Sequence, residues 1–259
     1  MPRFKITIEY DGTGLVGWQR QDNGPSVQAA LEKAAAAITG QRYDVLIQGA
    51  GRTDAGVHAL GQVAHFDLQQ EFDPYRMPLA FNAHLPDAIR VTDAEQVDDD
   101  FHARFHATAR AYRYRILNRR VASAIERGFV WHIHHPLDRD AMQAAADRLI
   151  GSHDFSTFRA THCQALSPVK TLDVLRIEEE QQGLAVIAEA RSFLHHQIRN
   201  ITGTLVQVGL GKWTADDVSD ALAAKSRAAG GPTAPPDGLY LTSVFYDGVP
   251  EVKDEPNLD

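Results

Sequence analysis

Residues 49–59 read GAGRTDAGVHA, in which three glycines and three alanines surround Arg52, Thr53, Asp54 and His58. Glycine adopts strained backbone dihedrals and lets another molecule approach the backbone closely. The segment lacks the Lys-Ser/Thr ending of a P-loop and the GxGxxG spacing of a dinucleotide-binding turn. The ordinary interpretation is a glycine-rich hairpin loop with a local Arg–Asp pair. The alternative is a loop that receives a ligand and presents Asp54 to it.

A lone carboxylate limits the chemistry of such a loop. Aspartate has an ordinary pKa of about 3.9, so we expect Asp54 to be ionised near neutral pH. An ionised carboxylate acts as a nucleophile or a base and not as an acid. A glycosidase with two carboxylates needs a second acid across the site, and the neighbouring sequence indicates none.

Outward from this loop, the first part of the chain predicts alternating strands and helices. Residues 4–10 alternate apolar and polar side chains, which indicates a half-buried strand. Ser26 is a predicted cap for an alanine-rich helix that ends near Ile38. Short strands are expected at 45–48, 62–67 and 88–97, and a helix begins at Asp73-Pro74 and stops before Pro86. The order is βαββαβ.

The second part predicts the same order with one extra helix. Its expected elements are a strand at 109–118, a helix at 138–150, a hairpin of strands at 172–178 and 184–191, a helix at 194–210, a helix capped at Thr214, and a strand at 239–246. We therefore expect an α+β protein with two ferredoxin-like halves. Residues 1–105 form the half with the loop of Asp54, residues 106–259 form the other half, and a central cleft between them is the expected ligand site.

Composition restricts the class of protein. The chain has 259 residues, 44% of them apolar, a net charge of −8 and one cysteine, Cys163. A single cysteine excludes an internal disulfide and a zinc site built from several cysteines. No stretch of about 18 apolar residues occurs, so no membrane span is expected. We expect a cytoplasmic protein.

One segment is basic, although the net charge of the whole chain is negative. Residues 101–120 hold six arginines and no acidic residue. Within AYRYRI, Tyr112 and Tyr114 share one strand face, and Arg113 and Arg115 share the other. In one interpretation the tyrosines are core residues and the arginines are solvated. In the other, Tyr112 stacks on a base, and Arg110, Arg113 and Arg115 contact an RNA backbone.

Two further motifs carry polar residues that could be functional. In RSFLHHQIRNITGTLV, His195, Arg199 and Thr202 fall along one side of the expected helix, although an arginine beside an apolar stripe is most often a surface residue. WHIHHP and His195-His196 permit a histidine metal site, but HExxH does not occur. Metal catalysis is the less favoured interpretation.

Together these motifs resemble the tRNA pseudouridine synthase A family over the whole chain. The matching segments are YDGTGLVGWQRQ at 10–21, GAGRTDAGVHA at 49–59, FHARFHATARAYRYRI at 101–116, GSHDFSTFRA at 151–160, FLHHQIRNI at 193–201 and TAPPDGLYL at 233–241. GRTDAGVHA is highly specific on its own. Gln197 and Ile198 depart from the family's usual Met and Val, while the arginine and asparagine that follow are kept.

The resemblance implies a pseudouridine synthase fold and a role for each matching residue. Asp54 matches the catalytic aspartate, Arg52 the arginine that helps to draw out the target nucleotide, Tyr112 the tyrosine that stacks on the target base, and Arg199 the arginine that pairs with the aspartate. It further implies isomerisation of uridines at positions 38 to 40 of the tRNA anticodon arm, by a homodimer, without cofactor or metal.

Two other classes of function remain open. A non-catalytic RNA-binding module would use the basic segment and Tyr112 but not Asp54. A metal-dependent hydrolase would use the histidines.

Overall fold

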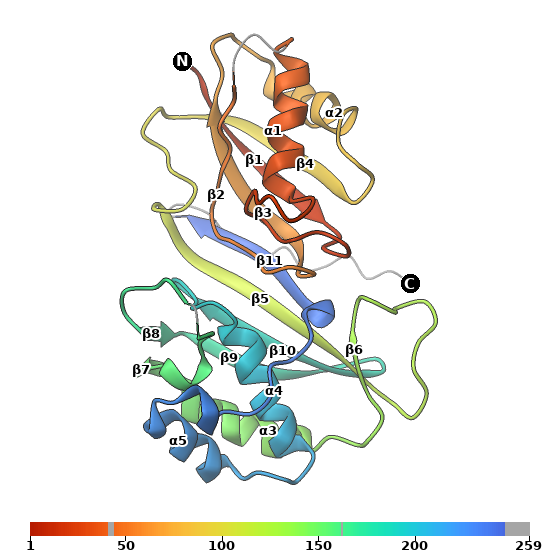
Figure 1. Ribbon diagram of the computed structural model, residues 1–259, viewed down its shortest axis with the longest axis vertical. Coiled ribbons are helices and arrows are strands. Elements are labelled where there is room, and N and C mark those ends of the chain that lie inside the picture. Colours follow the sequence, from red (N-terminus) through yellow and green to blue (C-terminus); the bar gives the residue numbers. More distant parts are fainter. Residues whose placement is uncertain (41–43, 162, 247–259) are drawn as a thin grey trace.

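A computed structural model describes residues 1–40, 44–161 and 163–246 of the chain (Figure 1). Within them the strands are β1 (Arg3–Tyr10), β2 (Gln48–Gly49), β3 (His58–Asp67), β4 (Ile89–Val97), β5 (Ala107–Asn118), β6 (Trp131–Ile133), β7 (Gly151–Asp154), β8 (Val169–Leu172), β9 (Val174–Glu180), β10 (Gly183–Ala190) and β11 (Leu239–Tyr246). The α-helices are α1 (Val27–Ile38), α2 (Met77–Asn82), α3 (Arg139–Ala146), α4 (Gln197–Gly209) and α5 (Ala215–Ala224).

One nine-stranded sheet runs through the molecule in the order β4-β1-β3-β11-β5-β10-β9, with β2 on β3 and β6 on β5. Most neighbours are antiparallel; β11 is parallel to β3, and β6 is parallel to β5. The expected α+β class is confirmed. The division at residue 105 stays a prediction, because the sheet continues from one half into the other.

Helices cover the sheet at both ends (Figure 1): α1 and α2 lie at the end with β1 and β4, and α3, α4 and α5 lie at the end with β9 and β10. Beneath the first group, Phe4, Ile6 and Ile8 alternate along β1 and are fully buried. Beneath the second, the core includes Tyr114 and Ile116 of β5. Each group buries an apolar face that its sequence period predicts.

The last strand, β11, joins these two parts of the sheet. Leu241 lies opposite Ala59 of β3 on one side and opposite Tyr112 of β5 on the other. Its side chain is completely buried in the core beneath α1. The strand that ends the described chain therefore fixes β3 and β5 relative to each other.

Some predicted boundaries are wrong for identifiable reasons. The strand expected at 45–48 is reduced to β2, because the backbone of Ile47 bonds to helix α1 instead: Ile47 donates to Glu32 at 3.4 Å and accepts from Gln28 at 3.1 Å. Strand β3 begins at His58, earlier than expected. The helix expected from Asp73-Pro74 begins as a 3₁₀ turn before α2, and the expected 138–150 helix ends as one after α3.

Among the described residues, no helix combines the length and the apolar character that a membrane crossing requires.

Candidate active site

The loop that carries Asp54 connects β2 to β3 and is held in place by a contact with strand β1. The buried Thr53 hydroxyl lies 2.8 Å from the hydroxyl of Tyr10, and the Thr53 carbonyl oxygen accepts from the backbone N–H of Trp18 at 3.1 Å. The backbone N–H of Val57 donates to the carbonyl oxygen of Asp54 at 3.2 Å and closes the turn. These bonds fix the backbone on both sides of Asp54.

The glycines of this loop do not all serve ligand approach, as the sequence pattern suggests. A Cβ at Gly49 would lie 2.5 Å from the indole of Trp18. Gly56 has a φ of +78° and faces Pro236 at 2.9 Å. These two glycines are therefore required by internal packing and backbone conformation. Gly51 has nothing within 4 Å of its missing Cβ, so it alone of the three leaves open space.

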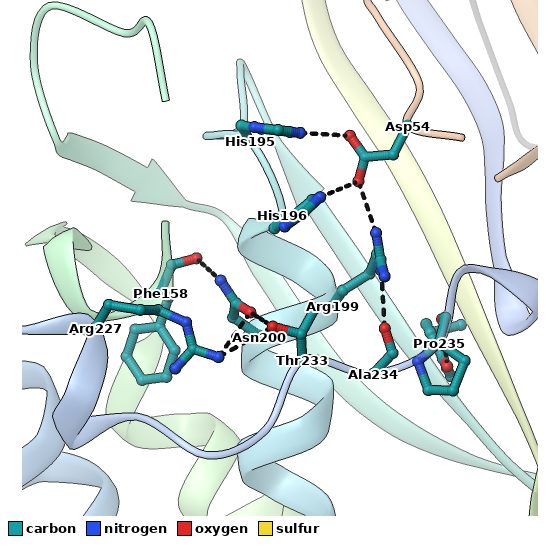
Figure 2. A network of polar contacts seen from close by, with 11 residues as sticks. Asp54, Phe158, His195, His196, Arg199, Asn200, Arg227, Thr233, Ala234 and Pro235 are labelled. Atoms are coloured by element: carbon teal, nitrogen blue, oxygen red, sulfur yellow. Dashed lines mark hydrogen bonds and ion pairs between the residues drawn. The ribbon is translucent and has the colours of Figure 1, made fainter. Parts of the chain in front are cut away.

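Three side chains converge on the Asp54 carboxylate (Figure 2). Nε2 of His195 lies 3.2 Å from Oδ1. Nε2 of His196 lies 3.5 Å and Nη1 of Arg199 lies 3.3 Å from Oδ2. The Asp54 side chain is 19% exposed, so solvent still reaches it. Both carboxylate oxygens are thus occupied by nitrogen donors.

This environment keeps Asp54 ionised. Burial favours the protonated form, but the hydrogen bond from His195 and the charges of His196, His195 and Arg199 outweigh it, so the pKa of Asp54 lies below its ordinary value. In return, the hydrogen bond to Asp54 raises the pKa of His195, while burial lowers the pKa of His196. The site presents a fixed carboxylate anion.

Arg199 belongs to the first turn of α4, and its side chain is only 13% exposed. Its Nε donates to the carbonyl oxygen of Ala234 at 2.8 Å, which leaves Nη1 directed at Asp54 (Figure 2). The expected proximity of Arg199 and Asp54 is confirmed, and the interpretation of Arg199 as a surface residue is wrong.

The expected helix from Leu194 begins later, at Gln197, because His196 has a left-handed backbone with a φ of +62°. His195 therefore lies outside the helix and does not share a helical face with Arg199. The side chain of Gln197 accepts from the backbone N–H of Leu194 at 2.8 Å and stabilises this turn. Both histidines reach Asp54 through this turn, and helical periodicity could not have shown it.

Tyr112 lies on β5 between the two cores and packs against both. Its ring meets that of Phe193 edge-on, with centroids 5.2 Å apart. Burial raises the pKa of the Tyr112 hydroxyl far above its ordinary value, and the charges of Tyr10 and Asp54 add to the shift. The tyrosine is therefore neutral and close enough to Asp54 to be affected by its charge.

Arg52 differs from these residues because it is exposed. Its Nη1 donates to the side-chain oxygen of Gln164 at 3.4 Å, a contact between segments 112 residues apart. Within the described part of the chain, this long bond to a neighbouring loop is what holds the guanidinium, so a ligand can compete for it.

The three arginines expected to meet RNA have protein partners in this structure. Arg110 is buried, and its guanidinium donates to four backbone carbonyl oxygens, including those of Ala50 and Arg191 at 2.7 and 2.6 Å. Arg113 and Arg115 both pair with Glu180, at 2.8 and 3.4 Å. The bonds of Arg110 to Ala50 and Arg191 connect the loop of Asp54 to the end of β10.

His58, the histidine of the opening motif, has a structural role that the sequence does not predict. Its Nδ1 accepts from the backbone N–H of Gly12 at 3.0 Å, and its Nε2 donates to the carbonyl oxygen of Gly128 at 3.1 Å. The ring stacks between Phe129 and Tyr240. Burial lowers the pKa of His58, so the neutral ring holds three segments together.

Comparison with known proteins matches the segments that carry Asp54 and Arg199. A family model described as tRNA pseudouridine synthase matches residues 6–106 and 145–247, which include Asp54 and Arg199. The chain belongs to the tRNA pseudouridine synthase family. The resemblance drawn from the motifs is confirmed, and the mixed sheet with its few helices is consistent with the fold of this family. Tyr112 lies between the two matched segments.

Individual members of the family match almost from end to end. The tRNA pseudouridine synthase A of Nitrobacter winogradskyi is 58% identical over 249 residues, which cover 96% of this chain and 97% of the relative. That of Rhodopseudomonas palustris strain BisB18 is also 58% identical, over 95% of this chain and all of the relative. That of Caulobacter sp. strain K31 is 56% identical over 96% and 99%.

Proposed function

We propose that this protein isomerises uridine to pseudouridine in tRNA, at positions 38 to 40 of the anticodon stem-loop, with Asp54 as the catalytic carboxylate. One observation carries the proposal beyond family membership. A largely buried arginine on α4 and two histidines fix an ionised aspartate, and the family's most specific motif supplies that aspartate.

The chemistry requires few groups. The N1–C1′ glycosidic bond of the uridine breaks, the uracil turns, and a new bond joins C5 to C1′, while the C5 hydrogen leaves as a proton and N1 takes up a proton. No water, redox change or energy source enters the balance. The reaction needs a carboxylate anion beside the sugar, a pocket that retains the free uracil, and a nucleotide turned out of its stack; Asp54 supplies the first.

Turning out the nucleotide costs a few kcal/mol, which contacts with the protein must offset. In our proposal the exposed Arg52 exchanges its long bond to Gln164 for the RNA and helps to draw the nucleotide out. Tyr112 stacks on the target base; such stacking contributes about 1–3 kcal/mol per base. Arg199 keeps Asp54 ionised when the nucleotide excludes water.

The remaining parts of the proposal concern assembly and surroundings. We propose a cytoplasmic homodimer that needs neither cofactor nor metal. RNA-backbone contacts by Arg110, Arg113 and Arg115 are part of the same proposal. The four carbonyl partners of Arg110 favour a structural role for that residue, whereas Arg113 and Arg115, with side chains 29% and 31% exposed, remain within reach of solvent.

The decisive experiment follows tritium released from tRNA that carries uridine labelled with ³H at C5, with and without EDTA. Isomerisation expels the C5 hydrogen, so we expect release that EDTA does not reduce. An RNA-binding module would bind the tRNA without release. A metal-dependent hydrolase would cut the tRNA and lose activity with EDTA. Either result would refute the proposal.

A further inference from the structure

Asp54 and the two histidines beside it form a potential metal site. Asp54, His195 and His196 each offer one ligand atom, and these atoms lie within 4.8 Å of one another. We propose that this cluster binds one Zn²⁺ or a similar transition-metal ion, and that the bound ion blocks the site. The inhibitory part of this proposal rests on the proposed function; the binding part does not.

The spacing of the ligand atoms suits a small tetrahedral ion. Zn²⁺ bonds to histidine nitrogen and carboxylate oxygen at about 2.0–2.2 Å, so neighbouring ligands of a tetrahedral site lie about 3.3 Å apart. The Asp54 oxygens lie 3.2 Å from Nε2 of His195 and 3.5 Å from Nε2 of His196. These contacts involve different oxygens, Oδ1 and Oδ2, and the three ligand atoms lie within 4.8 Å of one another, so one ion would draw the side chains closer together to reach the tetrahedral spacing.

The backbone at His196 brings the two imidazoles to the same carboxylate. Its φ of +62° is a left-handed conformation, which is uncommon for a residue other than glycine. The two rings lie 4.1 Å apart between centroids. Such strain is often found at functional sites. Here the left-handed backbone places two nitrogen ligands side by side without an ion.

The ligand types select the class of metal. Two imidazoles and a carboxylate suit Zn²⁺, Co²⁺, Ni²⁺ and Cu²⁺, whereas Mg²⁺ and Ca²⁺ prefer sites made of oxygen. The side chains of His195, His196 and Asp54 are 45%, 29% and 19% exposed, so an ion can enter and keep water at its open position.

Arg199 opposes the ion but does not close the site. Its Nη1 lies 3.3 Å from Oδ2 of Asp54, and its Nε is fixed by Ala234, so the guanidinium cannot simply follow the carboxylate. The contact of Arg199 is to Oδ2, so Oδ1, which faces His195, can ligate the ion. We therefore expect weaker binding than at a structural zinc site. A carboxylate that ligates the ion is no longer available to the nucleotide, which is why binding inhibits.

Binding is tested on the full chain without tRNA, by titration calorimetry with Zn²⁺ and by the visible absorption of Co²⁺, which is intense in tetrahedral sites. We expect one ion per chain and at least about tenfold weaker binding in His195→Ala and His196→Ala. His195→Gln and His196→Gln repeat the test with smaller changes in packing. The matched control is the double variant His134→Ala with His135→Ala, which removes adjacent exposed histidines with rings 3.9 Å apart.

Unchanged Zn²⁺ affinity in the His195 and His196 variants, or binding lost in the control, would overturn the proposal. The second readout is tritium release at increasing Zn²⁺. We expect inhibition that EDTA reverses and that requires more Zn²⁺ in His196→Gln, relative to that variant's own uninhibited rate. Stimulation by Zn²⁺ would refute the inhibitory part. Zn²⁺ bound at this cluster without any tritium release would instead refute the proposed function and leave the metal site standing.

Discussion

Arg199 and Ala234 exchange two hydrogen bonds: Nε of Arg199 donates to the carbonyl oxygen of Ala234 at 2.8 Å, and the backbone N–H of Ala234 donates to the carbonyl oxygen of Arg199 at 3.0 Å. The exchange fixes both the backbone and the guanidinium of Arg199. Nε of the guanidinium makes the bond to Ala234, and Nη1 donates to Asp54 at 3.3 Å.

The two-pronged arrangement predicts different effects for two substitutions. Lysine keeps the charge at position 199 but cannot reach Ala234 and Asp54 together. We expect Arg199→Lys to retain part of the rate of tritium release and Arg199→Ala to lose about a hundredfold or more. Both variants should bind tRNA nearly as wild type in filter binding, since Arg199 faces the carboxylate. Equal rates for all three proteins would show that Arg199 has no part in the reaction.

Asp54→Asn tests the carboxylate itself. Asparagine keeps the shape and removes the charge, so tritium release should fall below about 1% of the wild-type rate. Binding of tRNA should change by no more than a few-fold. Residual activity well above this level would exclude Asp54 as nucleophile or base.

A buried amide supports the loop behind Arg199 (Figure 2). Asn200 donates to the carbonyl oxygen of Phe158 at 2.9 Å, and its Oδ1 accepts from Thr233 at 2.6 Å and from Arg227 at 3.1 Å. Asn200→Ala should lower the free energy of unfolding by about 1–3 kcal/mol, because it leaves buried polar groups unpaired.

If this network also positions Ala234, Asn200→Ala should lower kcat for tritium release more than it changes KM. Thr233→Ser is the matched control, since it keeps the hydroxyl that donates to Asn200. A variant that is destabilised but has wild-type kcat would restrict Asn200 to stability.

The charge pattern of β5 predicts how binding depends on salt. Affinity for tRNA should fall steeply with salt despite the net charge of −8. Each phosphate contact contributes about 0.7–0.9 to the log–log slope, so changing Arg113 and Arg115 together to Ala should flatten it. Arg176→Ala is the control; this arginine lies on β9, is 61% exposed and pairs with Glu178. An unchanged slope in the double variant would assign both arginines to the Glu180 ion pairs alone.

His65 predicts a loss of stability in mild acid. Its Nδ1 accepts from the backbone N–H of Ala103 at 3.2 Å, and the residue is 2% exposed. Burial, above the charges of His102 and Arg3, lowers the pKa of His65 to about 4. The unfolded chain has a histidine pKa of about 6.5 and so takes up the proton first. Stability from this residue is complete above pH 6.5 and is lost as the pH falls toward 4.

The measurement for His65 is the free energy of unfolding in denaturant at pH 7 and pH 5. The wild type should lose more stability between these values than His65→Gln, in which the titrating group is absent. Equal losses in the two proteins would show that His65 does not take up the proton on unfolding.

Local patterns in the sequence predicted the elements that local interactions stabilise. The cap at Thr214 with Asp217 forms as expected, and the hairpin of β9 and β10 follows its turn. The paired strands β7 and β8 were not expected, since four residues each carry too little periodicity. The place of β11 between β3 and β5 depends on contacts distant in sequence, which no local pattern contains.

The site divides in the same way. The family's motifs single out Asp54 and Arg199, and the resemblance implies their pairing. Periodicity places His195 on a helical face, whereas the left-handed backbone of His196 makes the helix begin only at Gln197. That conformation is held by Gln197 and by contact with Asp54 from a distant loop, so it could not be read from propensity.

The position of β11 has a consequence for protein synthesis. At about 5–20 residues per second, a ribosome takes about 10–40 s to extend the chain from Asp54 to the start of this strand. During that interval the segment with Asp54 and the segment with Arg199 lack the strand that joins their sheets. The nascent chain therefore carries the Asp54 carboxylate without a fixed partner until its last described strand has been translated and paired.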